Sequence, residues 1–297
     1  MMLHLSPSYS SQNCRPVSRA FTLVEMLVVL GVMALLIGII FPVLSTVRNQ
    51  ANRTVEMAAA RSLMVAYTNY AAVNKDQVMP GYLEGMYVRD QTGHQVEGLT
   101  GARYPWRLAP FLDYNWLGLY KNIQAENFET FQYNDQETYR YLISLYPSLG
   151  LNTAFVGGDS RHSGFLTRPE GGGPYLYDIT GMFYVRRTSE VSQPNRLMVF
   201  CSARGRDPFS TNDISIEEGY FYVLSPYWLP NEDLRWKESF ALADEPSEYG
   251  FVAPRYQDEA VVALFDGHVD SFTENQLKDM RHWANGASKQ DWRLGDP

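Results

Sequence analysis

Two aspartates and a histidine near the C-terminus are of residue types that bind metal ions. Asp266, His268 and Asp270 alternate with other residues in the segment FDGHVD at 265–270. Because carboxylates are hard oxygen ligands, Asp266 and Asp270 are candidate calcium ligands. The Asp-Gly pair also predicts a β-hairpin with a type I′ turn, whose two central residues have positive φ. The segment lacks the dense oxygen-ligand spacing of a calcium loop, so the hairpin is favoured, calcium is the alternative, and no other cofactor is expected.

One further cluster has the residue types of a hydrolase. Asp159, Ser160 and His162 lie within four positions of one another, but a catalytic triad assembles from distant segments of a chain. Adjacency of this kind predicts a polar loop. We therefore expect a protein that is not an enzyme and has no catalytic residues.

A single carboxylate lies at the start of a long apolar run. Residues 19–44 read RAFTLVEMLVVLGVMALLIGIIFPVL, and Glu25 is the only charged residue after Arg19. The uncharged part, about 26–44, is long enough to cross a ~30 Å hydrocarbon core as a helix. A charge at the centre of such a helix costs roughly 2.5–3.5 kcal/mol. Glu25 either reaches the nearby membrane interface or has a partner of opposite charge.

The flanks of the run restrict its role. Arg15 and Arg19 precede it, and the first twenty residues contain no acid, which predicts a cytoplasmic N-terminus. The run exceeds the ~7–15 residues of a signal-peptide core, and no small-residue cleavage site follows it. A simple signal anchor, a cleaved signal and a specialised inserted subunit remain open on these grounds alone.

The segment AFTLVE at 20–25 resembles the processing site of type IV prepilins and type II secretion pseudopilins. The resemblance implies that an aspartic prepilin peptidase cuts between Ala20 and Phe21 and then methylates the amine of Phe21. Ala20 departs from the glycine that usually precedes the cut. Glu25 and Pro42 stand where the family has its acid and its proline. In that family the acid pairs with the N-terminal amine of a neighbouring subunit and sets the axial register.

The resemblance also implies a function and a location. It predicts a structural subunit, a pseudopilin or minor pilin, of a type II secretion pseudopilus or a type IV pilus-like filament. Its partners would be prepilin peptidase, other pilin or pseudopilin subunits, the inner-membrane assembly platform and membrane lipid. The chain would cross the inner membrane once, with a cytoplasmic N-terminus and a periplasmic C-terminal domain, before entering a periplasmic pseudopilus or a surface filament.

The apolar run is predicted to continue as one helix. No Gly or Pro interrupts residues 43–79, so we expect a helix over 21–74, with a transmembrane part at about 26–44 and a soluble half at 45–74. Such a helix is roughly 80 Å long. Pro42 removes a backbone donor and crowds the carbonyl one turn earlier, which predicts a bend or local melting. Residues 1–20 would be the leader and 75–297 a periplasmic or extracellular globular domain.

The soluble half of this helix shows an approximate apolar stripe. The stripe comprises Val47, Ala51, Val55, Ala58, Ala66 and Tyr70, with Arg48, Asn52, Glu56 and Arg61 on other faces. This pattern predicts that the stripe packs on the globular domain and that Glu56 does not.

The remaining chain predicts an α+β fold. Short apolar runs predict strands at 181–187, 196–201, 219–224 and 260–265, and helices are expected at 134–146 and 273–284. Together these elements fit a pilin-like lollipop, in which the long membrane-spanning helix packs on an antiparallel sheet with large loop insertions.

The C-terminal segment carries a second resemblance. The residues AVVALFDGHVD at 260–270 resemble the end of the planctomycete-type large pseudopilins named for a histidine, nine residues and Asp-Gly. The position of the naming histidine is occupied by Tyr256, which puts any role of that histidine in doubt here. The segment SLGLN at 148–152 resembles an internal segment of the same group more weakly.

Charge and cysteine content exclude some alternatives. The formal net charge is −8, and removal of a leader with two arginines and no acid leaves about −10, so no nucleic-acid partner is expected. Cys14 leaves with the leader. Cys201 then remains alone, cannot form an internal disulfide, and is expected to be a buried thiol.

Aromatic residues suggest the competing function. They form 14% of the chain and gather at 104–106, 114–116 and 227–229. Exposed Tyr and Trp bind sugars or proteins, which would make the chain a membrane-anchored adhesin or carbohydrate-binding module. Packing within the core is the other explanation.

Overall fold

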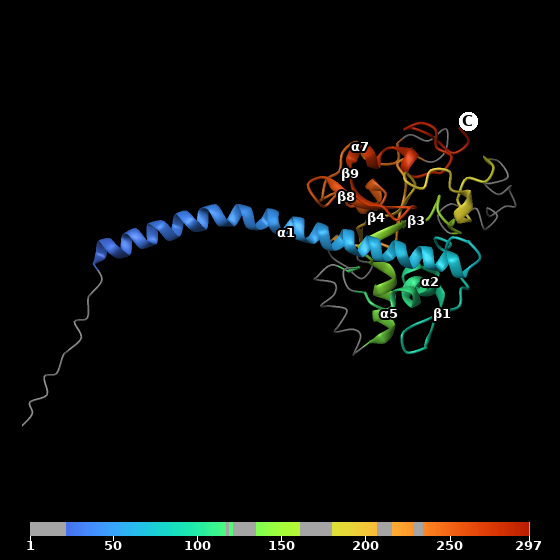
Figure 1. The fold of residues 1–297 in the computed structure, drawn as a ribbon, viewed down its shortest axis with the longest axis horizontal. Coiled ribbons are helices and arrows are strands. Elements are labelled where there is room, and N and C mark those ends of the chain that lie inside the picture. The colour runs from blue at the N-terminus through green and yellow to red at the C-terminus, as the bar shows by residue number, and fades with distance from the viewer. Residues whose placement is uncertain are drawn as a thin grey trace, which may run out of the picture. The chain divides into compact units, whose positions relative to one another are not determined.

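The computed structural model describes residues 22–116, 119–120, 135–160, 180–206, 216–227 and 234–296. The chain divides into two compact units, Met1–Arg48 and Asn49–Pro297. The second unit contains every described strand and every helix after the first (Figure 1).

The longest element is α1, which spans Leu23–Val73. Its end is set by Lys75 and Asp76, which both have positive φ, and the Asp76 N–H donates to the carbonyl of Ala71 at 2.9 Å. The long N-terminal helix is therefore present; of the expected range 21–74, α1 covers Leu23–Val73, and Phe21 lies outside the described residues. The helix runs without interruption through position 42, so the local melting considered for Pro42 does not occur.

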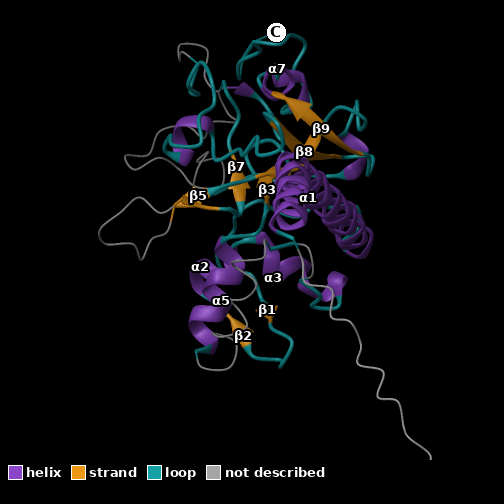
Figure 2. Ribbon diagram, turned by 90° about the vertical axis from the view of Figure 1, so that its left-hand side faces the viewer, coloured by secondary structure: helices purple, strands orange, loops and turns teal. Residues whose placement is uncertain are grey.

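The core of the second unit is a five-stranded sheet with the order β7-β3-β4-β8-β9 (Figure 2). Its strands are β3 (Leu149–Asn152), β4 (Met198–Ser202), β7 (Tyr222–Val223), β8 (Glu259–Leu264) and β9 (Val269–Thr273). Adjacent strands are antiparallel except β3 and β7, which are parallel. The sheet is thus mixed rather than wholly antiparallel, because β7 joins the edge beside β3 after a long excursion instead of a hairpin.

Three of the four expected strands are present. The runs at 196–201, 219–224 and 260–265 correspond to β4, β7 and β8. The strand expected at 181–187 is wrong, since Val185 and Arg187 form only isolated bridges, to Val156 and Gln77. The partners of this run lie in irregular chain rather than in a strand, so no ladder can form.

Both helices expected after residue 74 begin directly after a capping residue, Asp135 or Thr273. Helix α5 spans Gln136–Leu145, and the Asp135 side chain accepts a hydrogen bond from the Thr138 N–H. The single helix expected at 273–284 is wrong: the chain forms α7 (Glu274–Leu277) and then the 3-10 turn η4 (Met280–His282). Asp279 interrupts it, because its backbone is extended and its side chain caps η4 through the Arg281 N–H.

The other described elements are short. They are β1 (Val88–Arg89), β2 (Gln95–Val96), α2 (Gly98–Ala102), α3 (Tyr104–Leu108), η1 (Ala109–Leu112), η2 (Thr188–Glu190), β5 (Gly205–Arg206), β6 (Ile216–Glu217) and η3 (Pro246–Tyr249). The strands β1 and β2 pair as one small ribbon, and β5 and β6 as another.

Both faces of the sheet are buried. On β8, Val261 and Ala263 join the cluster that contains the C-terminal part of α1, whereas Val262 and Leu264 join a second cluster with Trp283. Successive side chains of a strand face opposite sides, so a strand covered on both sides is apolar throughout. This explains the unbroken apolar run at 260–264.

Candidate functional site

The first turn of α1 is closed by a reciprocal pair of side chains. Thr22 donates from its backbone N and from Oγ1 to Oε2 of Glu25, at 2.8 Å each, and the Glu25 N–H donates to Thr22 Oγ1 at 3.2 Å. This is a capping box, in which two free N–H groups of the helix terminus gain acceptors. The Glu25 carboxylate also lies at the positive end of the helix dipole.

The capping box places the acid of the motif beside the predicted cleavage site. The Glu25 carboxylate contacts Thr22, the residue that follows Phe21. Ala20 and Phe21 themselves lie outside the described residues. Glu25 and Pro42 are both in α1, and the carboxylate is exposed, so it is accessible to a second chain.

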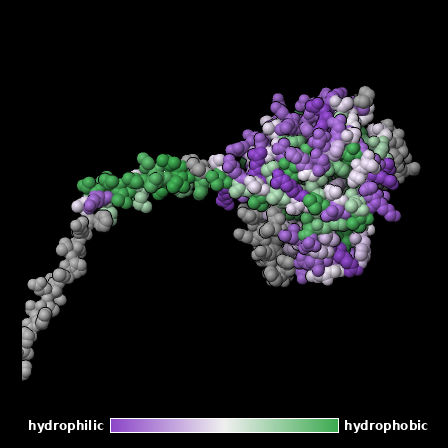
Figure 3. All heavy atoms as spheres, in the orientation of Figure 1, coloured by the Kyte–Doolittle hydropathy of each residue, from purple (hydrophilic) through white to green (hydrophobic). Residues whose placement is uncertain are grey.

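The apolar part of α1 is not covered by the rest of its own chain. Every large apolar side chain described between Leu23 and Leu44 is at least 48% exposed. Figure 3 shows this green surface along the first part of the helix. Its length and composition suffice to cross a membrane, and soluble monomers rarely leave so large an apolar area in water.

The turn between β8 and β9 differs from the expected type. The Gly267 N–H donates to the Leu264 carbonyl at 2.9 Å, and the Leu264 N–H donates to the His268 carbonyl at 2.8 Å. Gly267 has φ +88°, whereas Asp266 is not among the residues with positive φ. The hairpin is confirmed, but its loop is a type I turn followed by a left-handed glycine, so type I′ is wrong.

The two candidate calcium ligands are used locally. Asp266 Oδ1 accepts from the His268 N–H at 2.9 Å, and Asp270 Oδ1 accepts from the Ser271 N–H at 2.7 Å. In the described part of the chain, no group of three or more His, Cys, Asp or Glu side chains could hold a metal ion. The hairpin therefore offers these two carboxylates no third ligand of that kind.

Tyr256, where the resemblance of the C-terminal segment leads one to expect a histidine, contacts α1. Its hydroxyl donates to Oε2 of Glu56 at 2.6 Å, and both residues are buried. Burial and the adjacent Glu56 raise the pKa of Tyr256, so the phenol stays protonated and acts as the donor. The expected orientation of α1 is therefore correct only near its C-terminal end: Ala66 is buried and Tyr70 packs on the core, whereas Val55 is exposed and Glu56 faces the core.

The correct face of α1 has its own signal in the sequence. Ala60, Leu63 and Tyr67 are buried with Glu56, and these four positions follow steps of four, three and four, the spacing of one helix face. The sequence pattern is assigned to the wrong face at Glu56, because a charged residue is rarely buried unless it is paired.

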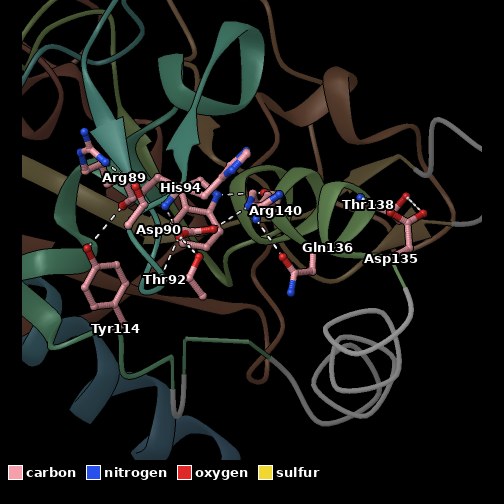
Figure 4. A network of polar contacts seen from close by, with 11 residues as sticks. Arg89, Asp90, Thr92, His94, Tyr114, Asp135, Gln136, Thr138 and Arg140 are labelled. Carbon is pink, nitrogen blue, oxygen red and sulfur yellow. Dashed lines mark hydrogen bonds and ion pairs between the residues drawn. The ribbon is translucent and has the colours of Figure 1, made fainter.

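A polar network joins the β1–β2 ribbon to α5 (Figure 4). Asp90 accepts from the Thr92 and His94 N–H groups at 2.9 Å, and from Arg140 Nε at 2.7 Å. Burial alone would raise the pKa of Asp90, but the hydrogen bonds from Thr92, Arg140 and His94 outweigh it and lower the pKa. Sequence analysis missed this pair, since fifty positions separate its members.

The network lies beside an open groove. Its lining includes acidic side chains and the basic side chain of Arg140. The groove is lined by His94, Gln95, Val96, Glu97, Thr100, Glu137, Thr138, Arg140 and Tyr141. The positive charge of Arg140 is already engaged by Asp90.

The described aromatic residues of the three segments lie in the core or pack against it. Tyr104 and Trp106 are fully buried, so the segment at 104–106 belongs to the core. Trp116 is half-buried and packs edge-on against Trp106. Trp228 and Leu229 lie outside the described residues, as does His162 of the polar cluster.

One family model matches the chain: the prokaryotic N-terminal methylation motif, over residues 15–41. No curated protein matches the chain, and no solved structure does. The motif indicates a type IV pilin-like precursor that prepilin peptidase processes and that assembles with other pilin subunits. The matched range contains the capping box and most of the uncovered apolar surface of α1.

Proposed function

We propose that this chain is a structural subunit, a pseudopilin or minor pilin, of a type II secretion pseudopilus or a type IV pilus-like filament. Prepilin peptidase cuts it between Ala20 and Phe21 and methylates Phe21. The observation that carries the proposal is a coincidence in one segment: the methylation motif at 15–41 overlaps an apolar helix surface that the chain itself leaves uncovered. Membrane lipid covers such a surface first, and neighbouring helices cover it after assembly.

The remaining parts of the motif have roles in assembly. Glu25 pairs with the methylated amine of Phe21 in a neighbouring subunit, and Pro42 bends α1 as it leaves the bilayer. The subunit crosses the inner membrane once, with the globular domain in the periplasm, because the basic residues precede the apolar run. The inner-membrane platform then adds it to a periplasmic pseudopilus or a surface filament.

The mass of the mature N-terminus tests the processing step. The full chain is expressed in cells with and without a prepilin peptidase, and the purified membrane protein is analysed by intact mass spectrometry. We expect loss of residues 1–20 and the addition of one methyl group only with the peptidase. An unmodified Met1 in both strains, or a cut elsewhere, contradicts the proposal.

Variants at the residue before the cut provide the matched control. Ala20→Gly restores the usual family residue and should be processed at least as fast as the wild-type chain. Ala20→Trp places a bulky side chain there and should remain uncut. Co-purification with a secretion platform, or recovery in sheared surface filaments, then distinguishes the pseudopilus from the pilus.

A further inference from the structure

The first buried side chain described in α1 belongs to a charged residue. Among the described side chains of α1, Glu56 is the first that is buried, at 3% exposure. Its partners come from two other segments of the second unit. Ser202 Oγ donates to Oε1 at 2.5 Å, and Oε2 lies 2.6 Å from the Tyr256 hydroxyl and 3.4 Å from Arg255 Nη1. A carboxylate without such partners would be very costly to bury.

The partners of Glu56 are held in place by the sheet itself. The Val261 N–H donates to Ser202 Oγ at 2.8 Å. Arg255 Nη2 donates to the carbonyls of Ser148, at 3.3 Å, and Ala203. The site that receives Glu56 is therefore fixed by contacts that do not involve α1.

A second ion pair of opposite polarity lies one helical turn before Glu56. Arg53 Nη2 is 2.8 Å from Oε2 of Glu259, and Arg53 Nε donates to Ser271 Oγ at 2.7 Å. The order on the helix is positive then negative, at 53 and 56. The complementary charges are Glu259, the first residue of β8, and Arg255, in the turn before that strand.

This arrangement disfavours a slip of α1 by one turn in either direction. A slip in one direction places Arg53 against Arg255, so two positive charges meet and Glu56 loses all its partners. A slip in the other direction places Glu56 against Glu259 and leaves Arg255 buried opposite the alanines at 59 and 60. Each slip combines like-charge repulsion with an unpaired buried charge.

The apolar contacts specify the register less strongly. Ala59, Ala60 and Ala71 present only methyl groups on the buried face of α1. Met64 is a flexible side chain that adapts to irregular space. Leu63 and Tyr67 are larger and fully buried, and they also favour one register. The charges add specificity beside the small alanine side chains.

We infer that Arg53, Glu56, Arg255 and Glu259 form a register latch, which fixes the axial position of the globular unit on α1. The latch acts within one chain and is independent of the filament that the chain builds. Fixing register is the best-attested role of buried polar pairs between packed helices.

Distance measurement on the full chain in detergent tests the latch. Spin labels are attached to Ser62→Cys on the exposed side of α1 and to Ser247→Cys, also exposed, with Cys14→Ser and the buried Cys201 left unchanged. We expect one narrow distance for the wild-type background. Arg53→Glu combined with Glu56→Gln should broaden the distribution or shift it in steps of about 5 Å, one helical turn.

Matched variants separate charge from packing. Adding Glu259→Arg to Arg53→Glu reverses the outer pair and should restore the single distance that Arg53→Glu alone disturbs. Arg61→Gln, an exposed charge of the same helix, should change nothing. Hydrogen exchange over 49–60 should rise roughly tenfold or more in Glu56→Gln, which leaves Arg255 without a counter-charge.

Two outcomes overturn the latch. One is an unchanged distance distribution in the Arg53→Glu, Glu56→Gln variant while its folded signal persists. The other is equal disturbance by the reversed pair and by Arg53→Glu alone. If the doubly substituted chain does not fold, the Tyr256→Phe variant is measured instead, because this substitution removes one hydrogen bond to Glu56 and no charge. Hydrogen exchange over 49–60 that is identical to that of the wild type then counts against the latch.

Discussion

At the scale of single residues, Glu25 makes two separable interactions. It accepts hydrogen bonds from Thr22 within its own chain, and in the proposed filament it pairs with the Phe21 amine of another subunit. The first needs only an acceptor oxygen, whereas the second needs a negative charge. Substitutions that keep one property and remove the other can therefore distinguish the two.

We predict that Glu25→Leu and Glu25→Gln are both inserted and cleaved but poorly incorporated into filaments. Glu25→Gln retains an acceptor for Thr22 and lacks the charge, so its defect isolates the ion pair. Thr22→Val removes the hydroxyl from the capping box and keeps the charge, and should assemble nearly as wild type. The measurement is the subunit content of sheared or purified filaments relative to membrane-bound subunit. Normal incorporation of Glu25→Gln contradicts the pairing.

Asp90 makes a second prediction, for stability. Asp90→Asn leaves the Arg140 guanidinium buried without a counter-charge, which should cost about 2–3 kcal/mol of unfolding free energy at neutral pH. Because the pKa of Asp90 is lowered in the folded state, its contribution is complete above the unfolded pKa of about 3.9. The contribution is lost as the pH falls through the folded value.

Urea unfolding as a function of pH measures this effect. The gap between wild type and Asp90→Asn should be constant near neutrality and close below about pH 4. Gln136→Ala is the control, since it removes only the hydrogen bond from Arg140 Nη2 and should show a small, pH-independent loss. A gap that persists at low pH would assign the cost of Asp90→Asn to packing instead.

At the scale of elements, the β8–β9 loop depends on one glycine. Gly267 has φ +88°, yet a Cβ there would meet nothing within 4 Å. Only backbone strain therefore opposes a side chain. Gly267→Ala should lower the unfolding free energy by about 1–2 kcal/mol, and Gly267→Asn by less, because Asn tolerates the left-handed region. Gly286→Ala is the control, with equal space and no positive φ, and should be nearly neutral in thermal unfolding.

Elements with local signals could be predicted from the sequence, and elements set by tertiary contacts could not. Helix α5 begins directly after Asp135, which caps it, and ends shortly before Pro147, and β8 is an apolar run before Asp-Gly. The segment at 181–187 has a short apolar run, but its residues form only isolated bridges and no described strand pairs with it. The helix at 273–284 was broken by Asp279, whose capping competes with helix continuation. The buried side of α1 was misjudged because Glu56 is paired by residues about two hundred positions away.

The same division applies to the candidate site. The methylation motif is contiguous over residues 15–41, so it could be recognised from the sequence, whereas the assembly roles of Glu25 and Pro42 stay predictions. The Asp90–Arg140 pair and the four charges of the register latch come from separate segments. Each of these residues is unremarkable alone, and only the fold brings them together.

At the scale of the whole molecule, Cys201 reports on global unfolding. It is fully buried on β4, and burial raises the pKa of its thiol. It is the sole cysteine once the leader is removed. We predict that the mature chain resists thiol alkylation under native conditions and is labelled only as the second unit unfolds, since the thiolate is the reactive form.

Parallel measurements check this expectation. The urea dependence of alkylation should coincide with that of tryptophan fluorescence, because Trp283 lies in the same cluster as Cys201. Ser62→Cys is the control, since that site is exposed and should react at once. Rapid native labelling of Cys201 would show that β4 opens locally.

The capping box at Glu25 bears on how a subunit leaves the membrane. The Glu25 carboxylate already accepts hydrogen bonds within its own chain, so its hydrogen-bonding capacity is partly used before any second subunit binds. In the proposed filament, pairing with the Phe21 amine of a neighbour would exchange one set of donors for another, so the net contribution of Glu25 would be the difference between the two. A small difference at this residue would favour neither the lipid nor the filament strongly. The same carboxylate would serve growth and disassembly alike.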